Sequence, residues 1–98
     1  MRLEYKRERL FDGSKTLLSF RKEKICSGTG YSAVCTIRDK KICDKTGYSA
    51  VCNVNRDYVC EKTGFKKLIK IKDIRKEIKN SDILSDAHIA AIWWYIIK

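Results

Sequence analysis

The residues best suited to chemistry in this 98-residue chain are five cysteines and a single histidine, His88. The cysteines are Cys26, Cys35, Cys43, Cys52 and Cys60. Such residues can bind zinc, form disulfides, or act as a catalytic nucleophile and base. The spacing argues against zinc and disulfides, because the chain has no Cys-x-x-Cys pair and its cysteine count is odd.

An internal repeat explains the cysteine spacing. Three near-copies of a 17-residue unit begin at Lys24, Lys41 and Tyr58, and they read KICSGTGYSAVC, KICDKTGYSAVC and YVCEKTGFKKLI. If each copy forms two strands, a strand separates the equivalent thiols, which is too far for a disulfide. We therefore expect reduced, partly buried cysteines in a cytoplasmic protein, with no metal and no cofactor. Zinc binding, disulfides and redox sensing are the alternatives.

No other group of side chains predicts catalysis. The chain has no Ser-His-Asp set, and Gly28-Thr29-Gly30 belongs to a repeat turn rather than to a phosphate loop. Residues 84–96 locally resemble the last helix of small c-type cytochromes. The haem-attachment sequence Cys-x-x-Cys-His is absent, however. We therefore expect a protein that is not an enzyme.

Charge gives the strongest functional signal. The chain has 22 Lys and Arg against 12 Asp and Glu, for a net charge of +10. Such an excess attracts polyanions in a salt-dependent way. Smaller clusters lie at residues 2–9 and 21–24, and the largest lies at residues 62–79. The polyanion-binding residues predicted from that largest cluster are Lys62, Lys66, Lys67, Lys70, Lys72, Arg75, Lys76 and Lys79. The first hypothesis is a small basic protein that binds nucleic acid or a nucleic-acid-containing complex.

Apolar residues on the face predicted to be wet suggest a protein partner instead. Val34, Val51 and Leu68 occupy equivalent repeat positions, and with Trp93 they are the candidate partner-binding residues. In size and charge the chain resembles compact inhibitors that phages and mobile elements make against nucleic-acid-handling enzymes. Such an inhibitor is the second hypothesis, and a structural module that forms a homodimer is the third.

Alternating apolar and polar residues predict the sheet that must position these groups. Asp-Lys-Thr-Gly suits a type I turn closed by a left-handed glycine. The register that follows places Tyr31, Tyr48 and Phe65 on the core face. The outer face would then lack an aromatic ladder, which argues against stacking of unpaired bases. We expect an α+β fold with an antiparallel meander of about six strands, and a further strand is a candidate at Leu3–Leu10.

The C-terminal residues are expected to cover the apolar face of this sheet. Asp73–Lys79 has the spacing of a short helix. A second helix follows Ser85, the predicted N-cap, and its apolar surface predicts burial. The chain would be one domain, residues 1–98, with the repeat meander at 24–71 and the helical cover at 73–97.

A membrane partner is not expected. The uncharged run from Ala87 to Ile97 is shorter than the roughly 20 residues that span a bilayer. The first ten residues carry charges throughout, unlike a secretory signal.

Overall fold

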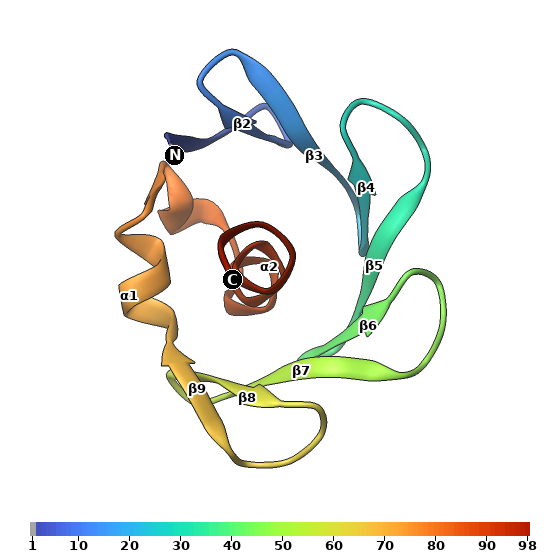
Figure 1. The fold of residues 1–98 in the computed structure, drawn as a ribbon, viewed down its shortest axis with the longest axis vertical. Helices are drawn as coiled ribbons and strands as arrows, with labels where there is room; N and C mark the ends of the chain where they lie inside the picture. Colours follow the sequence, from blue (N-terminus) through green and yellow to red (C-terminus); the bar gives the residue numbers. More distant parts are fainter. Residues whose placement is uncertain (1) are drawn as a thin grey trace.

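The computed structural model describes residues 2–98, and its dominant feature is a ten-stranded sheet that curls around a central helix (Figure 1). The strands are β1 (Leu3–Lys6), β2 (Arg9–Asp12), β3 (Lys15–Arg21), β4 (Lys24–Ser27), β5 (Ala33–Arg38), β6 (Lys41–Asp44), β7 (Ala50–Asn55), β8 (Tyr58–Glu61), β9 (Lys67–Lys70) and β10 (Ile78–Lys79). The helical elements are α1 (Ile71–Arg75), a 3-10 turn (Ser81–Ile83) and α2 (Asp86–Ile92), which continues as a π-helical turn (Trp93–Ile97).

The sheet is a meander, as the sequence predicts. Strands β1 to β9 pair in chain order, each antiparallel to the next. The number of strands exceeds the expected six. The N-terminal stretch holds two strands rather than one, joined by a turn in which Arg7 and Glu8 both take positive φ.

The short helix and β10 close the ring around α2. Helix α1 occupies Ile71–Arg75, earlier than the predicted Asp73–Lys79. The chain then forms β10, which pairs in parallel with β1, so β9 and β10 are the two edges of the sheet and α1 lies between them. The cover therefore lies inside a curled sheet, with strands and α1 surrounding it (Figure 1).

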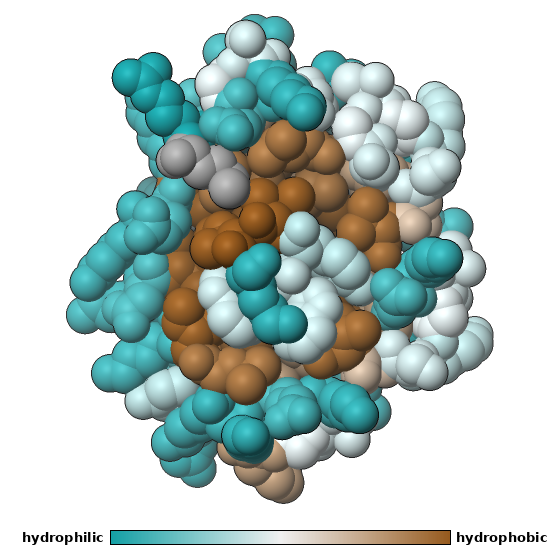
Figure 2. Space-filling model, viewed as in Figure 1, coloured by the Kyte–Doolittle hydropathy of each residue, from teal (hydrophilic) through white to brown (hydrophobic). Residues whose placement is uncertain are grey.

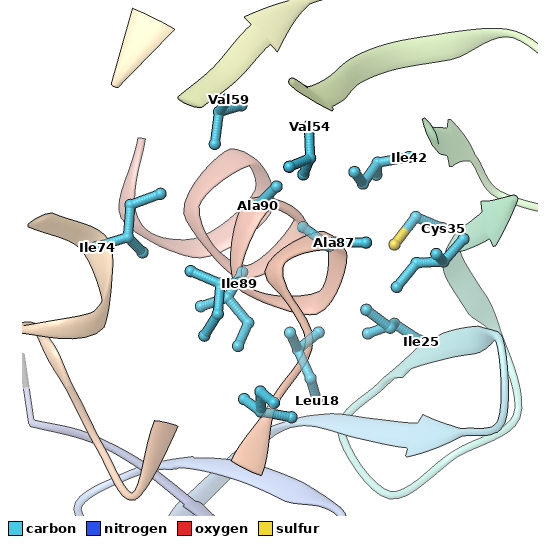
Figure 3. Packing of buried hydrophobic residues seen from close by; sticks show 14 of the residues in the cluster. Leu18, Ile25, Cys35, Ile42, Val54, Val59, Ile74, Ala87, Ile89 and Ala90 are labelled. Carbon is cyan, nitrogen blue, oxygen red and sulfur yellow. The ribbon is translucent and has the colours of Figure 1, made fainter. Parts of the chain in front are cut away.

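Side chains from the whole ring converge on α2 (Figure 3). Ile25 and Ile42 from the sheet and Ile74 from α1 are almost fully buried, as are Ile89 and Ile92 of the helix. Burial of each such side chain contributes about 1.5–3 kcal/mol. The predicted N-cap is confirmed, because Ser85 Oγ accepts a hydrogen bond from the backbone N–H of His88 at 3.3 Å.

The register of the repeat hairpins differs from the prediction. Ile42 pairs with Cys52 and Cys43 pairs with Ala50, so Val51 is an extra residue in β7. Similar register shifts occur in the β4–β5 and β8–β9 pairs. An extra residue reverses the face on which the preceding side chains lie.

The three repeat aromatics therefore lie in solvent, and their predicted place in the core is wrong. Tyr31 is 83% exposed, Tyr48 is 82% exposed and Phe65 is 78% exposed. The predicted register would place Ala33 and Ala50 on the same core face as these rings, and both are only half-buried. Each pairs with a cysteine outside the core cluster.

Turn geometry is the physical reason for the error. The turn forms where predicted, since the N–H of Gly47 bonds to the Asp44 carbonyl at 3.1 Å. The left-handed residue is Lys45 (φ 52°), however, and Gly47 does not have positive φ. The glycine therefore does not close a tight three-residue loop. The longer loop and the bulge at Val51 together set the observed register.

Replacement of Ile89 by alanine tests the central position of α2. Because this side chain is completely buried among the ring residues, Ile89→Ala should lower the free energy of unfolding by about 2–5 kcal/mol. The matched control is Ile83→Ala, whose side chain is 78% exposed and should contribute less than about 0.5 kcal/mol. Urea denaturation monitored by circular dichroism gives both values, and equal effects would contradict this packing.

Candidate functional site

The loops of the repeat hairpins fold back over the outer face of the sheet. Thr36 Oγ1 donates to the Lys45 carbonyl at 2.6 Å, and Asn53 Nδ2 donates to the Lys62 carbonyl at 2.6 Å. Ser19 Oγ makes the equivalent bond to the Gly28 carbonyl. Side chains of the preceding long strand thus fix the first residue of each loop.

The extra residues of the long strands complete this anchorage. The N–H of Lys45 bonds to the Val34 carbonyl at 3.0 Å, and the N–H of Lys62 bonds to the Val51 carbonyl at 3.2 Å. Gly28 bonds in the same way to the Leu17 carbonyl at 2.8 Å. Each loop is therefore tied to the strand of the hairpin before it, so neighbouring hairpins hold one another in place.

The five cysteines are buried on both faces of the sheet. Cys35 and Cys52 lie in the core around α2. The other three are equally buried but lie outside that core, and they pair with Ser19, Thr36 and Asn53, the residues that anchor the loops. All five are free thiols, and burial raises the pKa of Cys35 and Cys52 to about 12. Within residues 2–98, no three His, Cys, Asp or Glu residues gather closely enough to hold a metal ion.

Two exposed tyrosines have an arginine against one face of the ring. The guanidinium carbon of Arg21 lies 4.1 Å from the ring centroid of Tyr31, and that of Arg38 lies 3.9 Å from the centroid of Tyr48. Loop carbonyls hold both arginines, because Arg21 donates to Thr29 at 3.2 Å and Arg38 donates to Gly47 at 3.0 Å. The rings are therefore supported from one side and open to solvent on the other.

Folding brings two basic clusters together in an open groove between the β1–β2 turn and β3. Its basic side chains are Lys6, Arg7, Arg9, Arg21 and Lys22, and its acidic side chain is Glu8. Arg21 Nε is buried there without a hydrogen-bond partner. The sequence shows both clusters, at residues 2–9 and 21–24, but gives no sign that they adjoin. The residues of this groove were therefore not among the predicted polyanion-binding residues.

Most of the predicted basic residues lie along one arc of the ring. Lys62, Lys66 and Lys67 belong to the third loop and the start of β9, and Lys70, Lys72, Lys76 and Lys79 lie in or near β9, α1 and β10. All of these lysines are exposed. The ion pairs Lys66–Glu61 (3.9 Å) and Lys76–Asp73 (3.8 Å) are exposed too, and they contribute little to stability.

Arg75 differs from the other predicted basic residues, because it is only partly exposed and its guanidinium is engaged by hydrogen bonds. It donates to the Leu84 carbonyl and to Asp86 Oδ1 at 2.8 and 2.9 Å, and it also bonds to the Ser81 carbonyl. These contacts tie α1 to the start of α2. Arg75 therefore supports the fold and is not a free member of the basic surface.

The predicted apolar patch does not lie on the solvated face of the sheet, where it was expected. Val34, Val51 and Leu68 are the extra residues at the bulges, and they pack half-buried against the end of the core. Trp93 and Trp94 pack there as well, with ring centroids 6.2 Å apart, and neither is fully buried. Figure 2 shows this end of the molecule, with apolar residues around the end of the helix and hydrophilic residues at the rim.

Comparison with known proteins gives no relative for this chain. It matches no protein-family model, no curated protein and no solved structure. Among the described residues, no helix combines the length and apolar character needed to cross a bilayer.

Thiol modification tests the assignment of the cysteines to packing. With a pKa of about 12, roughly one Cys35 or Cys52 in ten thousand is ionised at pH 8, so iodoacetamide should leave both unmodified in the native protein. Denatured protein is the control, in which all five should react. Peptide mass spectrometry locates the modified residues, and rapid native labelling of either one would contradict the structure.

Proposed function

We propose that this protein binds nucleic acid through its basic surface and catalyses no reaction. The observation that carries this proposal is the open groove between the β1–β2 turn and β3, where five basic side chains face one acidic side chain. Like charges gathered at one place cost electrostatic energy, which a polyanion would offset. Phosphate contacts of this kind give affinity without sequence specificity.

The second basic surface extends this footprint around the ring. Seven exposed lysines between Lys62 and Lys79 make this surface positively charged, as the groove is. The eighth residue of the predicted cluster, Arg75, is engaged by hydrogen bonds within the fold. Their weak surface ion pairs leave most of that charge available to a ligand. In this proposal the groove and the lysine arc both contact phosphates.

We also infer that residues 1–98 form one domain, in which the meander at 24–71 is built from a 17-residue unit. The support is that equivalent donors, Ser19, Thr36 and Asn53, bond to equivalent loops. Five buried free thiols favour a reducing, cytoplasmic setting.

A role as a protein inhibitor, or as a homodimer module, is the second candidate. The observation in its favour is that Trp93 and Trp94 pack only half-buried against the core. Figure 2 shows apolar surface gathered on one face of the molecule. A partner that covered this end would bury apolar and aromatic surface, as protein interfaces do at their centre. The inhibitor function predicts one tightly bound protein partner and weak binding to free nucleic acid.

Charge reversal in the groove tests nucleic-acid binding directly. Lys6→Glu combined with Lys22→Glu should weaken binding of labelled duplex DNA, measured by fluorescence anisotropy at low salt. The matched control, Lys15→Glu with Lys40→Glu, changes two exposed residues outside the groove and alters the net charge equally. Binding by the parent should also fall about 10-fold or more between 50 and 200 mM salt.

Two results would contradict the proposal. A parent protein that binds neither duplex nor single-stranded nucleic acid at low salt would exclude nucleic acid as the ligand. Equal loss in the groove variant and the control would show that net charge, and not the groove, determines binding. Lys66→Glu with Lys70→Glu tests the lysine arc in the same assay.

A further inference from the structure

We propose that Tyr31, Tyr48 and Phe65 form a row of stacking platforms for unpaired bases, so that the ligand is single-stranded nucleic acid. This inference rests on the proposed function and names the ligand class for it. The sequence argued against base stacking only because these rings were expected in the core. Because the rings are exposed, that argument no longer holds, and the outer surface does carry aromatic rings on which bases can stack.

The three rings occupy equivalent positions on successive loops. The loops joining β4 to β5, β6 to β7 and β8 to β9 project outward around the ring of strands (Figure 1). Neighbouring loops are two strands apart, which is roughly 10 Å at the sheet and more at the tips of loops that project outward. Successive nucleotides of a duplex strand are only about 3.4 Å apart along its axis, so an unpaired strand of several nucleotides can offer a different base to each ring. The row therefore suits a flexible, unpaired polynucleotide.

Two of the three rings are held in place before any ligand binds. Arg21 and Arg38 support one face of Tyr31 and Tyr48, and loop carbonyls hold both arginines in place. A side chain that is already positioned loses less conformational entropy on binding. The open face of each of these two tyrosine rings can stack on a base while the arginine behind it supplies positive charge near the phosphates.

Charge selects this ligand over others that stack on aromatic rings. Arg21 contributes both to the basic groove and to the support of Tyr31, so the first platform adjoins the groove. At the other end of the row, Lys62, Lys66 and Lys67 flank Phe65 in the chain and are exposed. A neutral glycan or a proline-rich peptide would gain nothing from these cations. A base-paired duplex would contact the cations but could not offer its bases to the rings.

Removal of the rings without change of charge tests this inference. We would compare the parent with Tyr31→Ala/Tyr48→Ala, using a labelled oligo-deoxythymidine of about 15 nucleotides and a duplex of equal length. The variant should bind the single strand at least about tenfold more weakly, because each base–aromatic stack contributes a factor of this order. Its affinity for the duplex should not change, since all basic residues remain.

Tyr31→Phe/Tyr48→Phe is the matched control. It keeps both ring faces and loses only the hydroxyl groups, and the third loop already carries phenylalanine at this position. It should bind the single strand as the parent does. Circular dichroism would verify that both variants fold, as expected for side chains that are more than four-fifths exposed.

The possible results separate this inference from the proposed function. Unchanged single-strand affinity in the alanine variant would overturn the stacking platforms and leave phosphate binding intact. Equal loss in the phenylalanine and alanine variants would also overturn them, because the hydroxyl groups would then carry the contact. A parent protein that binds neither the single strand nor the duplex would overturn both proposals.

Discussion

The structure depends on the burial of one helix inside a curled sheet. A meander with a single apolar face cannot remain flat in water, and α2 offers an apolar surface on nearly every side. When the sheet curls around the helix, the apolar face of the sheet and the apolar surface of α2 are buried against each other. Closure by α1 and by the pairing of β10 with β1 then follows, because the ring must be complete for every side of the helix to be covered.

This arrangement frees the outer face of the sheet for other uses. The core lies on the concave side, so the convex side needs only enough packing to hold its own loops, and small residues such as Cys43 and Thr36 provide it. The loops can then carry rings and cations that have no role in the core. The aromatic row lies on loops that this outer layer anchors, and the third of these loops also carries Lys62 and Lys66 of the lysine arc.

Features set by local sequence could be predicted, whereas features that depend on the register or on tertiary contacts could not. The meander, the cap at Ser85 and the buried helix follow from local patterns, because alternation, capping chemistry and amphipathicity act over a few residues. The side on which Tyr48 lies depends on one extra residue, Val51, and on which loop residue takes positive φ. The joining of the two basic clusters likewise depends on tertiary structure, since the β1–β2 turn lies against β3 only in the folded chain.

The most direct test of the central claim is removal of residues 81–98, which include α2. Hydrogen exchange of the backbone amides, followed by nuclear magnetic resonance, would compare the shortened chain with the full one. If the sheet folds around the helix, the shortened chain should lose the slowly exchanging amides of β4 to β8 and its cooperative unfolding transition. Retention of a protected sheet with dispersed resonances would show that the strands fold without the helix and would contradict the account.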